Sequence, residues 1–89
     1  MIIEYTLDIL KPHHPSNDLL ARTLKELSGV RAVSVKTDEI DQKTTSIFVN
    51  IKGTDEMSLE MITQTLEKLN CSLHSVDEVK VEEKDWDPR

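Results

Sequence analysis

The sequence has few of the residues on which several common kinds of site depend. Its single cysteine, Cys71, excludes an internal disulfide, a Cys-x-x-Cys pair and an iron–sulfur cluster held by four cysteines of this chain. Aromatic residues are limited to Tyr5, Phe48 and Trp86, so surfaces on which nucleic-acid bases stack are scarce. No apolar run approaches the roughly 18–20 residues that span a bilayer, and the first residues do not resemble a signal peptide. We therefore expect a cytoplasmic protein without membrane partners.

Positive charge is also in short supply. Eleven Lys and Arg residues stand against 17 Asp and Glu, which gives a formal net charge of −6. An acidic chain repels phosphates, so nucleic acid is not an expected partner, and cations are the more reasonable ligands. The 89 residues suffice for one small domain with a thin core. We assign residues 1–81 to this domain and residues 82–89 to a charged, flexible tail, and we expect Cys71 to be a buried small hydrophobe.

Apolar and polar residues alternate along four segments, which is typical of β-strands. These segments lie near residues 2–10, 30–41, 46–51 and 71–81. The short polar stretch at 41–44 predicts that the middle two strands form a hairpin. In the last strand the spacing of apolar residues changes from three to two, which indicates a β-bulge or a twist near Ser75–Asp77.

Two further segments have the apolar spacing of amphipathic helices. Their apolar faces comprise Leu19, Leu20, Leu24 and Leu27 in the first segment, and Leu59, Ile62, Leu66 and Leu69 in the second. Ser16 and Ser58 are suited to cap the helix N-termini. Gly29 and Asn70 are suited to the left-handed conformation that often follows a helix.

The expected element order is β-α-β-β-α-β, the split βαβ arrangement of the ferredoxin-like fold. Right-handed crossovers then give an α+β sandwich with antiparallel strand order 4-1-3-2 and both helices on one face of the sheet. The uncovered face is predicted to carry Ile2, Glu4, Thr6, Asp8, Leu10, Phe48, Asn50, His74 and Val76. A solvated face would be almost wholly polar. The mixture of apolar and polar residues favours contact with another copy of the chain.

This topology also gathers imidazole and carboxylate groups at one end of the sheet. If residue numbers of the first and last strands sum to about 82 across the pairing, Asp8 and His74 become neighbours. The same register places Thr6 opposite Val76 and Glu4 opposite Glu78, a like-charge pair that calls for a cation or a basic partner between its members. Imidazole and carboxylate suit zinc, whereas carboxylates with carbonyls suit calcium. The candidate metal ligands are Asp8, His13, His74, Asp77 and Glu78. The alternative is that the histidines are ordinary loop and interface residues, because no His-x-His or His-Glu-x-x-His spacing is present. Lys11, near the expected start of the first helix, is a separate candidate for binding an anion.

Two short motifs resemble those of a known family. Residues 7–16 (LDILKPHHPS) and 74–79 (HSVDEV) are similar to the opening and closing motifs of the archaeal domain of unknown function 211 family. The resemblance covers about residues 2–81 and implies a ferredoxin-like fold without an established activity. It implies motif positions at Asp8, Lys11, His13, His74, Ser75, Asp77 and Glu78. His14 and the segment at 85–87 depart from the family's pattern.

The sequence favours a homo-oligomeric binding module without enzymatic activity, which takes a divalent metal ion or small ligand at a subunit interface. One alternative is a small enzyme with a site shared between subunits, in which His74 or His13 is the acid–base group and Asp8 orients it. Another is a purely structural assembly protein. Other users of this fold fit less well, because the chain lacks a phosphate-binding arginine loop, a Cys-x-x-Cys pair and exposed aromatic platforms.

Overall fold

The computed structural model describes residues 1–86. In chain order its elements are β1 (Ile2–Pro12), α1 (Asn17–Lys25), β2 (Val30–Ile40), β3 (Thr44–Thr54), α2 (Leu59–Lys68) and β4 (Ser72–Glu82). The predicted element order is confirmed. Each strand is 11 residues long, and β4 continues one residue into the segment that we expected to be a tail. Residues 87–89 of that segment lie outside the described residues.

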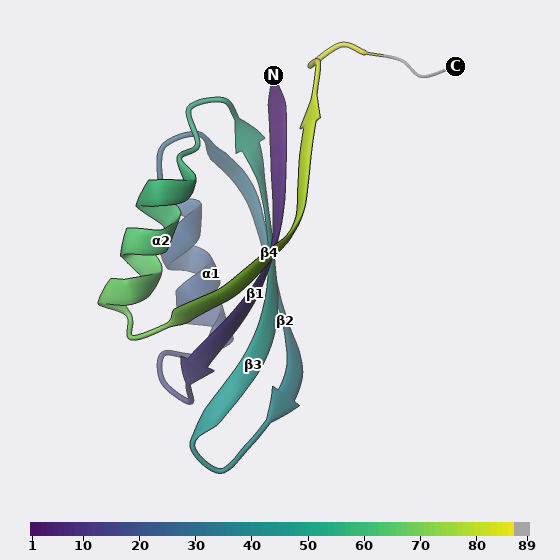
Figure 1. The fold of residues 1–89 in the computed structure, drawn as a ribbon. Coiled ribbons are helices and arrows are strands. Elements are labelled where there is room, and N and C mark those ends of the chain that lie inside the picture. The colour runs from purple at the N-terminus through teal and green to yellow at the C-terminus, as the bar shows by residue number, and fades with distance from the viewer. Residues whose placement is uncertain (87–89) are drawn as a thin grey trace.

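The strands form one antiparallel sheet of order β2-β3-β1-β4, which is the predicted order read from the other edge. Both helices lie on the same side of this sheet, and its other face carries no helix (Figure 1). The molecule is therefore an α+β fold of two layers. We call the face without helices the open face.

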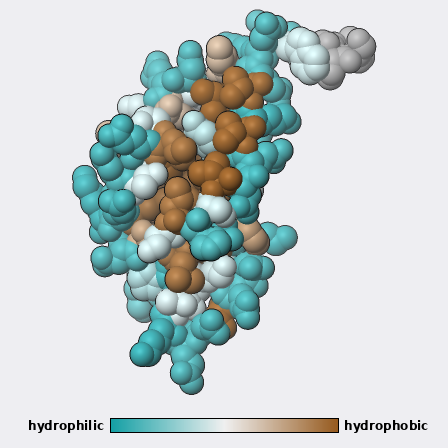
Figure 2. Space-filling view, viewed as in Figure 1, coloured by the Kyte–Doolittle hydropathy of each residue, from teal (hydrophilic) through white to brown (hydrophobic). Residues whose placement is uncertain are grey.

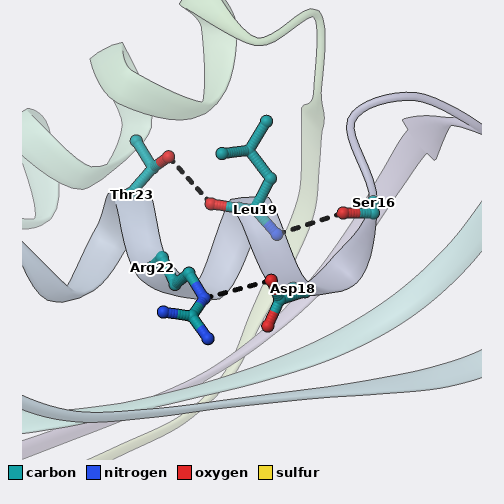
Figure 3. A network of polar contacts seen from close by, with 5 residues as sticks. All are labelled: Ser16, Asp18, Leu19, Arg22 and Thr23. Atoms are coloured by element: carbon teal, nitrogen blue, oxygen red, sulfur yellow. Dashed lines mark hydrogen bonds and ion pairs between the residues drawn. The ribbon is translucent and has the colours of Figure 1, made fainter.

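Local sequence signals define both helices. The Ser16 hydroxyl accepts a hydrogen bond of 3.1 Å from the Leu19 amide, and the Ser58 hydroxyl accepts one of 3.2 Å from the Met61 amide. Figure 3 shows the first cap beside the ion pair between Asp18 and Arg22 in the next turn. Each cap satisfies an amide that has no partner within its helix.

The two residues predicted to follow the helices in the left-handed conformation do so. Gly29 has φ +80°, and Asn70 has φ 62°. A Cβ on Gly29 would also lie 2.6 Å from the Met57 amide nitrogen, so both backbone conformation and space require glycine there.

The core lies between the helices and one face of the sheet. Its fully buried side chains come from both helices and the two central strands: Leu7, Ile9, Leu20, Leu24, Ile47, Val49, Ile51 and Leu66 have no exposed surface. Burial of each such side chain contributes about 1.5–3 kcal/mol to folding. Cys71 is buried as predicted, and burial raises the pKa of its thiol although the charge of Lys11 opposes the shift. The thiol is therefore a poor nucleophile near neutral pH.

The change in apolar spacing predicted one bulge or twist near Ser75–Asp77, and the pairing of β4 with β1 contains two irregularities. The register shifts between Thr6 and Leu7 and again between Asp8 and Ile9, which leaves Asp77 and His74 without paired residues on β1. Each bulge adds one residue to β4 and changes every later pairing.

Two expectations about this register were wrong for that reason. Glu4 pairs with Lys80 instead of Glu78, and Thr6 pairs with Glu78 instead of Val76. Val76 is opposite the core residue Leu7, so it lies on the helix side of the sheet and not on the open face.

Candidate functional site

Asp8 and His74 meet on the open face, as the sequence predicted. Asp8 lies on β1 between Phe48 of β3 and Ser75 of β4. The Nδ1 atom of His74 is 3.6 Å from Oδ2 of Asp8, with 76% of the His74 side chain and 26% of the Asp8 side chain exposed. This distance is too long for a hydrogen bond, so the two groups attract each other only when His74 is protonated. The pair presents one nitrogen and one oxygen ligand to the solvent.

His13 is not part of this pair. Its Nδ1 is 3.0 Å from the Thr45 hydroxyl, and its Nε2 is 2.9 Å from the Gln42 carbonyl oxygen. Because a carbonyl only accepts, the neutral ring carries its proton on Nε2 and accepts from Thr45 through Nδ1. His13 therefore links the β1–α1 loop to the hairpin between β2 and β3, and a metal would have to displace one of these contacts.

Lys11 has a similar structural role. Its side chain is on the core side of β1, and only 3% of the residue is exposed. The ammonium donates hydrogen bonds to the carbonyl oxygens of Pro12 and Pro15, at 3.0 and 2.6 Å. These carbonyls belong to the loop that leads into α1, so the charge of Lys11 is satisfied by the backbone that it holds in place.

Asp77 and Glu78 lie further along β4. Oδ1 of Asp77 accepts a hydrogen bond of 2.6 Å from the Ser75 hydroxyl. Glu78 is near Lys80, whose pKa is raised first by its hydrogen bond and charge contact with Glu82 and then by the charges of Glu4 and Glu78. The cation that we expected between Glu4 and Glu78 is therefore a lysine of the same chain.

The five candidate ligands do not form one cluster. In the part of the chain that the structure describes, no group of three His, Cys, Asp or Glu side chains is placed to hold a metal ion. Of the five candidates, only Asp8 and His74 lie close enough to each other to act as two ligands of one metal ion.

A polar network that sequence reasoning missed crosses the middle of the open face. The side-chain amide of Asn50 donates to the Glu4 carboxylate at 2.9 Å and to the Thr6 hydroxyl at 3.2 Å. Asn50 is opposite Thr6 in the β1–β3 pairing, so correct strand register alone would have identified the second contact. These bonds order the polar centre of the face beside Asp8.

Several apolar side chains of the sheet are exposed. Leu10 of β1, two residues beyond Asp8, is 45% exposed on the open face. Ile40, at the end of β2, is 69% exposed on the helix side, because it pairs with Thr45, which is opposite the core-side Lys11. Along β4, Val76, Val79 and Val81 are 37%, 57% and 56% exposed. Figure 2 shows apolar side chains continuing along the upper half of β4 on the helix side. We call Val76, Val79 and Val81 the β4 strip.

Together, the two layers and the uncovered face define a small α+β protein with a single antiparallel sheet. A family model described as uncharacterized ArCR, domain of unknown function 211, matches residues 4–85, and the chain belongs to this family. The uncharacterized protein MJ0319 of Methanocaldococcus jannaschii is 38% identical over 73 residues, which cover 82% of this chain and 74% of that protein. The family resemblance of the two motifs is confirmed. Within residues 1–86, no helix is long and apolar enough to cross a membrane.

Proposed function

We propose that the protein is a self-associating binding module that holds a divalent metal ion between two copies of the open face. The carrying observation is the exposed Asp8–His74 pair on a sheet face that no helix of the chain covers. Leu10, two residues beyond Asp8 on the same face of β1, provides apolar surface for the contact. Association would bury this surface and give a small domain additional core.

The incomplete ligand set supports a shared site. Asp8 and His74 supply two ligands, and a two-fold contact doubles every group that it contains. The resulting two imidazoles and two carboxylates match the four-coordinate preference of zinc. Calcium is the weaker candidate, because it takes six to eight oxygen ligands. Asp77 and Glu78 remain possible carboxylate contributors on β4, whereas His13 is less suitable because both its ring nitrogens have partners.

Two broader assignments belong to the same proposal. We assign the fold to the ferredoxin-like class, because the element order is that of a split βαβ unit and the strand order is the one expected for it. We assign the protein to the cytoplasm, because its lone buried cysteine leaves no disulfide framework that needs an oxidising compartment.

Native mass spectrometry of the whole chain tests the proposal, with zinc added and then removed by a chelator. We expect a dimer or a larger even assembly that retains one zinc ion for every two chains. His74→Ala should lose the zinc and weaken the association. His14→Ala is the matched control, because it removes an exposed imidazole from the β1–α1 loop and leaves Asp8 and His74 intact.

The other outcomes separate the alternatives. A strict monomer at micromolar concentration overturns the proposal. Assembly that neither zinc nor His74→Ala changes favours a purely structural protein. Turnover of a screened substrate that His74→Ala abolishes favours an enzyme with a shared site.

A further inference from the structure

A second region of the open face carries positive charge, although the protein as a whole is acidic. A hollow of about 440 Å³ lies where β1 begins and β3 ends. Its walls include the apolar side chains of Ile2 and Ala32 and the basic side chains of Arg31, Lys52 and Lys84. Hollows of roughly 300–1,000 Å³ with an apolar surface and a few convergent polar groups are typical of small-molecule sites.

The charge of this hollow is unexpected for the chain. The protein has a net charge of −6, yet three cations line the hollow with one carboxylate, that of Asp55. Within residues 1–86, none of the three cations is in an ion pair: the close pairs are Arg22–Asp18, His74–Asp8 and Lys80–Glu82. Glu4 is opposite Lys52 in the β1–β3 pairing, but its carboxylate accepts a hydrogen bond from Asn50. The three cations at the hollow therefore outnumber the one carboxylate that lines it, and a local excess of positive charge attracts an anion.

The backbone beside the hollow has two irregular features, a β-bulge at Arg31 and a close approach at Gly53. The β2–β3 register shifts between Val30 and Ala32, so Arg31 is an extra residue without a partner on β3. A bulge of this kind redirects a side chain relative to a regular strand. At Gly53, which also lines the hollow, a Cβ would collide with the Gly29 carbonyl oxygen, so only glycine permits this approach of β3 to the residue before β2.

We infer that the hollow binds a small organic anion. Its phosphate or carboxylate group would contact Arg31, Lys52 and Lys84, and its apolar part would lie against Ile2 and Ala32. This site is distinct from the proposed metal site, because Ile2 and Asp8 are about 20 Å apart along β1 at about 3.3 Å per residue. The inference does not rest on the proposed function.

Chemical-shift titration of the ¹⁵N-labelled whole chain tests the ligand class. The probes are phenyl phosphate, benzoate, inorganic phosphate and the neutral benzyl alcohol. We expect phenyl phosphate or benzoate to shift the amides of Ile2, Ala32 and Lys52, more weakly at high salt. Binding of neither anion overturns the inference. Equal binding of benzyl alcohol overturns the role of charge, and equal binding of inorganic phosphate overturns the role of the apolar wall.

Matched substitutions test the location. Lys52→Gln should weaken binding roughly three- to fivefold, the effect of losing one exposed charge contact. Lys25→Gln is the control, because Lys25 lines the separate hollow between α1 and β2, which Arg31 also borders. Equal weakening by both variants, or shifts centred on α1, would contradict the assignment. His74→Ala should leave the affinity unchanged, which keeps this test separate from the zinc experiment.

Discussion

The two edge strands of the sheet, β2 and β4, differ in how the chain protects them. On β2, α1 packs over the half-buried Val33 and Val35, and the exposed outer half carries Lys36, Asp38 and Glu39. On β4, α2 packs far less extensively, and the β4 strip is left exposed on the helix side. Charged side chains, which both edge strands carry, discourage pairing with other chains, whereas the exposed apolar side chains of β4 invite contact. Helix α1 therefore covers the apolar side chains of β2, whereas the apolar side chains of the β4 strip stay exposed to solvent.

The largest expected effect concerns the anchor of the β2 edge. In Gly53→Ala the new methyl group would push β3 away from the Gly29 carbonyl. This movement would disturb the 2.9 Å hydrogen bond that the Thr54 amide donates to that carbonyl. We expect a loss of about 3–4 kcal/mol in the free energy of unfolding, from overpacking together with a lost hydrogen bond. Urea unfolding measures it. A loss of less than 1 kcal/mol would mean that the β2 edge does not depend on this contact.

A smaller effect is expected from the cap of the helix that covers β2. Ser16→Ala removes the hydroxyl that accepts from the Leu19 amide and should cost about 1 kcal/mol. Ser58→Ala is the matched change in α2. Thermal and urea unfolding of both variants compares the two helices. If either substitution leaves the free energy of unfolding unchanged, packing alone stabilises that helix.

Much of the fold could be predicted from the sequence, and the parts that could not be predicted have physical causes. Alternation, caps and helix-ending residues predicted the elements and the strand order, because these signals are local. The register of β4 was not predicted, because two bulges act in one strand and each changes every later pairing.

The sites were harder to predict than the fold. The proximity of Asp8 and His74 was predicted, although Asp8 pairs with Ser75 and His74 is the extra residue beside it. His13 was grouped with them because its real partners lie about 30 residues away and one of them is a backbone carbonyl. The basic hollow was missed because its cations come from a bulge, a strand and the segment after β4, and no spacing connects them.

Cys71, the buried residue just before β4, gives a pH-dependent prediction. Because burial raises the pKa of Cys71, the folded protein keeps the thiol proton to higher pH than the unfolded chain does. Stability is therefore unaffected below the ordinary thiol pKa of 9.0 and falls as the pH rises from there through the raised value. Cys71→Ala should reduce this alkaline slope while lowering stability at neutral pH. Urea unfolding at several pH values measures the slope, and an unchanged slope would show that other groups cause it.

The smallest expected effect lies at the exposed end of β4. Val35→Ala on β2 removes half-buried methyl groups and should cost about 1 kcal/mol, whereas Val79→Ala removes methyl groups from a residue that is 57% exposed and should cost less than about 0.5 kcal/mol. Urea unfolding at low protein concentration gives this difference for the single chain. The same measurement at high concentration sharpens the comparison of the edges. If a second copy covers the β4 strip, the cost of Val79→Ala rises with concentration, because association adds to the stability of the folded state. If the cost stays constant, the strip faces water at both concentrations and no second copy covers it.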